Sequence, residues 1–116
     1  MDRSRLPAHL SPAEADAIAE LADAARRLLG LDLYELLLYG SRARGEGNED
    51  SDIDLALIVT PEGRARRNEV YDIAYDIGLR HRVLLAPTLI ERERLDELRR
   101  RERLFARELD RDGVPL

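Results

Sequence analysis

Two aspartates are spaced so that both can lie on one face of a strand. Asp52 and Asp54 stand at the start of the apolar run 53–59, and side chains two residues apart in a strand point the same way. Carboxylates this close repel each other, and burying both without compensation is costly. A hard divalent cation removes the conflict, because Mg²⁺ is commonly held by one or two carboxylates together with substrate phosphates. The spacing therefore predicts a magnesium site that faces a phosphorylated ligand.

A glycine–serine step supplies the second half of the pattern. Gly40 and Ser41 end the apolar stretch 33–39, and a glycine there lets the backbone turn sharply and approach a ligand closely. Ser41 offers a hydroxyl, and the amides that follow can open a short helix whose N-terminal end favours anions. Arg42 and Arg44 are candidate phosphate partners. This segment therefore predicts a cradle for phosphate groups.

Each half alone is weak evidence for function. An Asp-x-Asp sequence is usually a solvated strand entrance, and a Gly-Ser step is usually only a turn. Here the two follow one another between two strand candidates, and Gly45 and Gly47 let the connecting loop return to the acidic strand. A phosphate cradle opposite a metal clamp is typical of nucleotidyl or phosphoryl transfer, in which catalysis is mostly positioning and charge neutralisation.

The elements that must position these residues form one mixed α/β domain. We expect a loose lead-in over 1–10 and a single domain over 11–116. Ser11, Pro12 and Glu14 predict a capped helix start, and Gly30 a helix end. The expected order is α-β-β-α-β-α, with helices mainly on one face of the sheet. After the first helix we expect strands at 33–39, 53–59 and 83–90, a turn at 60–63, and helices at 64–82 and, as one or two helices, 91–112.

Composition excludes several classes of protein. The chain has 116 residues and a net charge of −5, so its surface as a whole is not built to attract nucleic acid. The arginines of 99–103 are interleaved with acids, which favours an exposed salt-bridged helix over an RNA-binding one. The absence of cysteine excludes disulfides and thiolate metal sites. No apolar run approaches the roughly 18 residues needed to cross a bilayer, and we expect a cytoplasmic protein.

The two halves together carry a family resemblance. The segments GSRARG (residues 40–45) and SDIDL (residues 51–55) resemble the signature of the minimal nucleotidyltransferases, the smallest members of the DNA polymerase β-like superfamily. The resemblance implies the polymerase β palm fold, Mg²⁺ and a nucleoside triphosphate, most often ATP. It also implies that Gly40 and Ser41 hold the triphosphate while Asp52 and Asp54 hold the metal.

The resemblance further implies a protein partner. Many stand-alone minimal nucleotidyltransferases are encoded beside HEPN-domain proteins as toxin–antitoxin pairs, in which the nucleotidyltransferase is the antitoxin and transfers AMP to a hydroxyl of the toxin. We therefore expect a HEPN-domain partner and a protein acceptor. The acceptor itself, the nucleotide preference and the oligomeric state, including a homo-oligomer, stay open at this point.

One position departs from the family pattern. The family usually takes a third carboxylate from a later strand, but here that strand reads HRVLLAPT (residues 81–88), with Leu84 and Leu85 where an aspartate is expected. This leaves two alternatives. Another acid substitutes, with Asp76 and Glu69 as candidates, or the domain binds nucleotide, transfers it poorly and neutralises its partner by direct binding.

Overall fold

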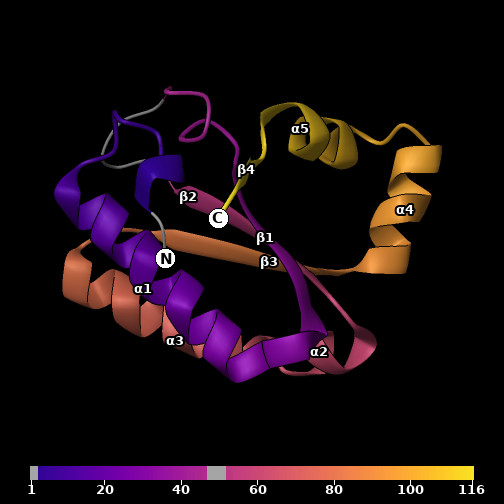
Figure 1. Ribbon diagram of the computed structural model, residues 1–116, viewed down its shortest axis with the longest axis horizontal. Helices are drawn as coiled ribbons and strands as arrows, with labels where there is room; N and C mark the ends of the chain where they lie inside the picture. The colour runs from indigo at the N-terminus through magenta and orange to yellow at the C-terminus, as the bar shows by residue number, and fades with distance from the viewer. Residues whose placement is uncertain (1–2, 47–51) are drawn as a thin grey trace.

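The computed structural model describes residues 3–46 and 52–116 and shows an α/β fold with a mixed four-stranded sheet (Figure 1). Gly47 and Ser51 of the predicted loop and motif, and the first two residues of the lead-in, lie outside the described residues. Along the chain the elements are η1 (Arg3–Arg5), α1 (Pro12–Leu29), η2 (Gly30–Asp32), β1 (Leu33–Tyr39), β2 (Ile53–Val59), α2 (Pro61–Ala65), α3 (Arg67–His81), β3 (Leu85–Glu91), α4 (Arg92–Arg100), α5 (Leu104–Asp112) and β4 (Val114–Pro115).

Helix α1 begins and ends where the sequence predicts. The amide of Glu14 donates to Ser11 Oγ at 3.1 Å, and the amide of Ser11 donates to Glu14 Oε1 at 2.9 Å, which forms the predicted capping box. Gly30 ends the helix with a φ of 53°. In front of α1, Leu6 and Leu10 pack against the core, and Arg3 pairs with Asp16.

The sheet has the order β3-β2-β1-β4, with β1 and β2 antiparallel and β2 and β3 parallel. The predicted bounds of β1 and β2 are confirmed. Strand β3 starts two residues later than predicted, because the amide of Val83 donates to the carbonyl of Gly78 and closes the end of α3. It is an edge strand, as Pro87 suggests, since proline cannot donate to a ladder.

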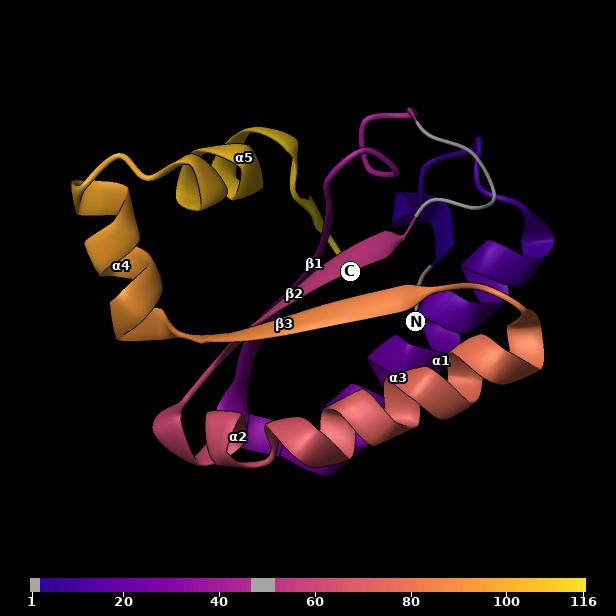
Figure 2. The ribbon, with the colours of Figure 1, turned by 180° about the vertical axis from the view of Figure 1, so that it is seen from behind.

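Apolar clusters lie on both faces of the sheet. The two longest helices, α1 and α3, cover one face and pack on side chains such as Leu38 and Leu55 (Figure 2). The shorter helices α4 and α5 pack against part of the opposite face, where Ala56 and Ile58 meet Leu95 and Leu109. Because strand side chains alternate, Asp54 shares this second face with Ala56 and Ile58.

Local structure differs from the prediction in three places. The segment 60–63 is the start of helix α2 rather than a turn, because Thr60 Oγ1 accepts a hydrogen bond from the amide of Gly63 at 3.0 Å. The predicted helix 64–82 is divided at Arg66 between α2 and α3. The short strand β4 was not predicted. Among the described helices, none is both long enough and apolar enough to cross a membrane.

Candidate active site

The cradle and the acidic pair meet at one end of β1 and β2. Tyr39 lies opposite Asp54 in the antiparallel register, and Gly40 follows it with a φ of 78°. A Cβ atom on Gly40 would lie 2.5 Å from Asp54 Oδ2, closer than real contacts allow. The left-handed backbone therefore favours glycine at this position, and a Cβ atom here would displace the Asp54 carboxylate.

The segment after Gly40 is a run of turns. The amides of Ala43 and Arg44 donate to the carbonyl of Gly40 at 3.1 and 3.3 Å, and the amide of Glu46 donates to the carbonyl of Ser41 at 2.9 Å. The predicted short helix is therefore wrong, although its first turn of hydrogen bonds is present. Within 40–46, these bonds leave out the amides of Ser41 and Arg42. The turn lies between the N-terminal segment and α5 in both views (Figures 1 and 2).

The two aspartates lack a cationic partner in the part of the chain that the structure describes. Asp52 is exposed and Asp54 half-buried, and across 3–46 and 52–116 no hydrogen bond or ion pair holds either carboxylate. Burial raises the pKa of Asp54 above its ordinary value, and the negative charges of Asp52 and Glu108 raise it further. The site thus has an excess of negative charge next to Gly40.

Glu108 is a residue of this neighbourhood that sequence reasoning missed. The ring of Tyr39 packs edge-on against Phe105 of α5, with 5.6 Å between ring centroids, and Glu108 follows Phe105 by one helical turn. Burial raises the pKa of the Tyr39 hydroxyl, and the nearby Thr88 side chain partly offsets this rise. Tyr39 therefore packs as the sequence suggests, and through it α5 reaches the acidic end of β2.

In the described residues, no third side chain joins Asp52 and Asp54 as a metal ligand, because no group of three or more histidines and acids could hold an ion there. The register places Ala86 of β3 beside Asp54 on the same face, rather than Leu84 or Leu85. The prediction that Asp76 or Glu69 replaces the third carboxylate is wrong, because both residues are exposed on α3, which packs on the face opposite to Asp54.

Arg42 has a different environment from the one predicted. Its side chain is 4% exposed, and its Nη2 lies 2.6 Å from Glu14 Oε1 and 2.5 Å from Oε2, with Nε 3.1 Å from Oε2. Its Nη1 donates to the carbonyl of Glu46 at 3.4 Å. The sequence predicts a phosphate partner here, but the guanidinium is used to compensate a buried carboxylate. Arg42 thereby ties the turn to the start of α1.

Glu14 remains ionised in this pair. Burial by itself would raise the pKa of Glu14, but the hydrogen bond from the Ser11 amide and the contact with Arg42 outweigh it, so the pKa lies below its ordinary value of 4.5. The sequence identifies Glu14 only as part of a capping box. Its second partner is 28 residues away along the chain, which no local pattern indicates.

Comparison with known proteins agrees with this geometry. Residues 18–110 match the model of the nucleotidyltransferase domain, a family of the polymerase β-like superfamily. The chain belongs to this family. It is also 35% identical over 75 residues to a protein of Methanocaldococcus jannaschii whose name proposes a protein adenylyltransferase activity. That match covers 62% of this chain and 51% of the relative, so the chain spans about half the relative's length.

Arg44 is the predicted phosphate partner that stays at the surface of the nucleotidyltransferase domain. Its side chain is 31% exposed, and its two ion pairs, with Glu46 and Asp112, are both long at 3.4 Å. The ring of His9 lies beside the same turn, because a Cβ atom on Gly45 would be 3.7 Å from its Nδ1. Arg44 is therefore held loosely enough to turn toward an anion.

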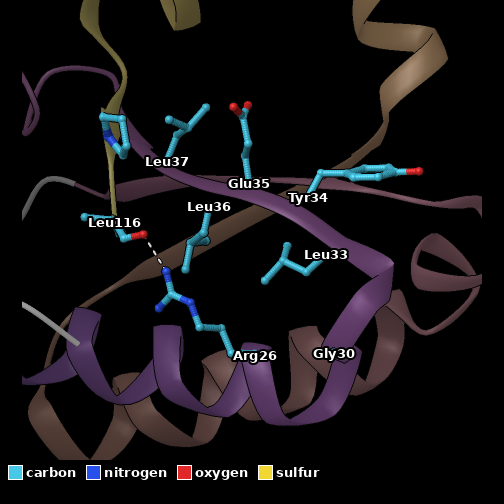
Figure 3. A pocket seen from close by; sticks show the side chains of 9 residues that line it. Arg26, Gly30, Leu33, Tyr34, Glu35, Leu36, Leu37 and Leu116 are labelled. Carbon is cyan, nitrogen blue, oxygen red and sulfur yellow. Dashed lines mark hydrogen bonds between the residues drawn. The ribbon is translucent and has the colours of Figure 1, made fainter.

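The nucleotidyltransferase domain also has a groove that does not belong to this site. A space of about 370 Å³ lies between the end of α1, the first half of β1 and the C-terminal residues (Figure 3). Arg26 crosses it and donates a hydrogen bond to the carbonyl of Leu116. This groove begins at Leu33, at the other end of β1 from Gly40, and it contains neither aspartate.

Proposed function

We propose that this nucleotidyltransferase domain binds ATP with Mg²⁺ at the junction of Gly40 and Asp54 and transfers AMP to a hydroxyl of a protein. The observation that carries the proposal is the position of Asp54 Oδ2, which faces the glycine of the cradle. Family membership supports a nucleotide substrate. The relative named for protein adenylyltransferase activity supports a protein acceptor.

The acidic pair suits a divalent cation. Asp52 directly precedes β2 and stands two residues before Asp54, no cation of the described chain neutralises either carboxylate, and the pKa of Asp54 is raised first by burial and then by nearby negative charge. These two carboxylates would hold Mg²⁺, as one or two carboxylates commonly do. When bound, the ion would neutralise charge on the triphosphate.

The chain's own residues then bind and orient the nucleotide. The Ser41 hydroxyl and the amides of Ser41 and Arg42 would donate to a phosphate bound at the turn, and Arg44 would add a positive charge. In the transfer, the acceptor oxygen forms a bond to the α-phosphorus while the bond from that phosphorus to the oxygen bridging to the β-phosphate breaks. Pyrophosphate leaves, and the hydroxyl proton passes to water, because in the described residues no third acid or histidine joins the two aspartates in a group that could hold an ion.

The partner remains a proposal based on the family resemblance. We propose that the acceptor is a HEPN-domain protein encoded next to this chain, and that the chain acts as its antitoxin in the cytoplasm. A second candidate function is neutralisation of that partner by binding without transfer. Ala86 favours this second function, because the β3 residue beside Asp54 carries only a methyl group and not a third carboxylate.

A transfer assay separates the two functions. The HEPN-domain neighbour is incubated with Mg²⁺ and ATP labelled at the α-phosphate, with ATP labelled at the γ-phosphate as the control for phosphoryl transfer. We expect α-label on the neighbour with the wild-type chain, none with Asp52→Asn combined with Asp54→Asn, and more with Ala86→Asp. A tight complex that stays unlabelled with both the wild type and Ala86→Asp would instead support simple binding.

A further inference from the structure

An apolar groove lies between the end of α3 and the start of β3. It has a volume of about 290 Å³, and its lining includes Ala74, Tyr75, Gly78, Leu79 and Leu84. The helix and the strand approach closely because position 78 is glycine: a Cβ atom there would lie 2.6 Å from the carbonyl oxygen of Val83. We call this surface the α3–β3 groove.

The rim of the α3–β3 groove exposes large apolar side chains. Tyr75, Leu79 and Leu84 are 68%, 62% and 61% exposed. With Tyr71, one turn before Tyr75, they make up four of the seven large exposed hydrophobic residues in the described chain. Contiguous apolar surface of this kind is typical of a protein–protein contact, and tyrosine is enriched in such contacts.

The groove lies at the same end of the sheet as the proposed transfer site, on the face that α3 covers. The amide of Ile53 donates to the carbonyl of Leu84 at 2.8 Å. Leu84 directly precedes β3 and Asp52 directly precedes β2, so the two residues lie at the same end of neighbouring strands. Neighbouring strands are about 4.8 Å apart. Since β3 is an edge strand, a segment seated against Leu84 would reach the two aspartates by passing around the start of β3.

The charged residues around the α3–β3 groove favour one kind of binding partner. Asp72 and Asp76 lie on the exposed side of α3 beside Tyr71 and Tyr75, and within the described ranges neither forms a salt bridge. Arg82 lines the groove and supplies one positive charge, and the charge of Arg80, near Asp76, is paired with Glu20, which leaves the surface acidic on balance. Such a surface favours a partner that carries lysine or arginine.

We propose that the α3–β3 groove is the docking site for the acceptor protein, and that it takes an apolar side chain from a basic segment that also carries the modified hydroxyl. The proposal rests on the proposed function, since it names the place where the acceptor binds. Docking there would hold the hydroxyl near the nucleotide, and such positioning lowers the barrier to attack.

Short synthetic peptides test the groove directly. The probe is an array in which each peptide has a central serine, threonine or tyrosine, flanked by varied combinations of apolar, basic, acidic and glycine residues. We expect the wild-type chain to prefer apolar–basic peptides. Leu79→Ser combined with Leu84→Ser should weaken that binding at least about tenfold, whereas Leu31→Ser, at an even more exposed leucine outside the groove, should leave it unchanged.

The remaining outcomes separate this proposal from the proposed function. The Asp52→Asn and Asp54→Asn double variant should keep the peptide preference while losing ATP–Mg²⁺ binding. Undiminished ATP–Mg²⁺ binding by that variant would sink the proposed function and leave the groove proposal standing. The groove proposal is overturned if the wild type prefers no apolar–basic peptides, or if the Leu79→Ser, Leu84→Ser variant binds them equally well. It is also overturned if sedimentation shows a wild-type dimer that this variant dissociates, because the groove would then bind a second copy.

Discussion

Glu14 and Asp54 are two acids of this small domain that have opposite surroundings. Glu14 is 2% exposed and is held by both the Ser11 amide and the Arg42 guanidinium. Asp54 is half-buried beside Asp52 and has no cationic partner in the described chain. The pKa of Glu14 is lowered and that of Asp54 is raised. One carboxylate is satisfied within the fold, and the other is left for a ligand.

The difference shows how one short motif can serve both stability and function. Arg42 and Arg44 lie two residues apart, yet Arg42 points inward to Glu14 while Arg44 stays at the surface with long contacts. An unpaired charged side chain is unfavourable for folding. A protein therefore retains one where a bound ligand neutralises its charge. The buried pair fixes the turn, and the fixed turn holds Gly40 against Asp54.

The largest effect is expected from breaking the buried pair. Glu14→Gln would leave the Arg42 guanidinium buried without its counter-charge, which typically costs about 3–5 kcal/mol. We expect the free energy of unfolding, measured in urea, to fall by that amount, and ATP binding to weaken because the turn loses its anchor. An unchanged unfolding free energy would show that the pair does not hold the turn.

The matched control is Glu20→Gln, because Glu20 is also held by an arginine, Arg80, but at the surface. Exposed pairs contribute little, so this variant should lose far less stability. The pH dependence gives a second check. Since the pKa of Glu14 is lowered in the fold, its contribution is present above its ordinary value of 4.5 and is lost as the pH falls through the folded pKa. The gap between wild type and Glu14→Gln should therefore narrow in acid.

The next largest effect is expected at the contact between the cradle and the acids. Gly40→Ala would place a Cβ atom against Asp54 Oδ2 and would add strain of about 1–2 kcal/mol, because φ is 78° there. We expect reduced stability and a loss of ATP–Mg²⁺ affinity of at least about tenfold, measured by calorimetric titration.

Gly30→Ala separates backbone strain from the contact with Asp54. Gly30 also has a positive φ, of 53°, but a Cβ atom there would meet nothing within 4 Å. This variant should lose stability and keep its affinity for ATP–Mg²⁺. An equal loss of affinity in both variants would mean that the contact between Gly40 and Asp54 does not position the acid.

Much of the fold follows from local sequence signals. The capping box at Ser11, the strands 33–39 and 53–59 and the glycine corner at Gly40 depend on neighbouring residues, and the structure has them where the sequence predicts. The sequence predicts a turn where α2 begins, because Thr60-Pro61-Glu62-Gly63 contains residues that suit both a turn and a helix N-terminus.

The rest of the site depends on contacts between distant segments. The partner of Arg42 comes from the first helix, and Glu108 approaches Asp54 only because Phe105 packs on Tyr39. The position beside Asp54 on β3 is Ala86, and the register of two parallel strands cannot be counted from the sequence. The sequence pattern indicates the strand on which a third acid is expected, but it does not show which residue of that strand faces the site.

The smallest effect is expected from neutralising the uncompensated acid. Because the pKa of Asp54 is raised in the fold, its charged form opposes folding at neutral pH, and this penalty disappears as the pH falls through the folded pKa. Asp54→Asn should therefore raise the unfolding free energy at neutral pH by less than about 1 kcal/mol. The gain should vanish as the pH falls toward 3.8, the ordinary pKa of an aspartate.

A control variant should change the unfolding free energy in the opposite direction. The pKa of Asp112 is lowered, first by its hydrogen bond with Arg111, so Asp112→Asn should reduce stability at neutral pH. Saturating ATP and Mg²⁺ should then reverse the order of wild type and Asp54→Asn, because a ligand that binds only the folded wild type stabilises it further. Thermal unfolding with and without ATP and Mg²⁺ measures both effects. If Asp54→Asn instead unfolds at neutral pH, the carboxylate is part of the structural framework, and the contrast with Glu14 is lost.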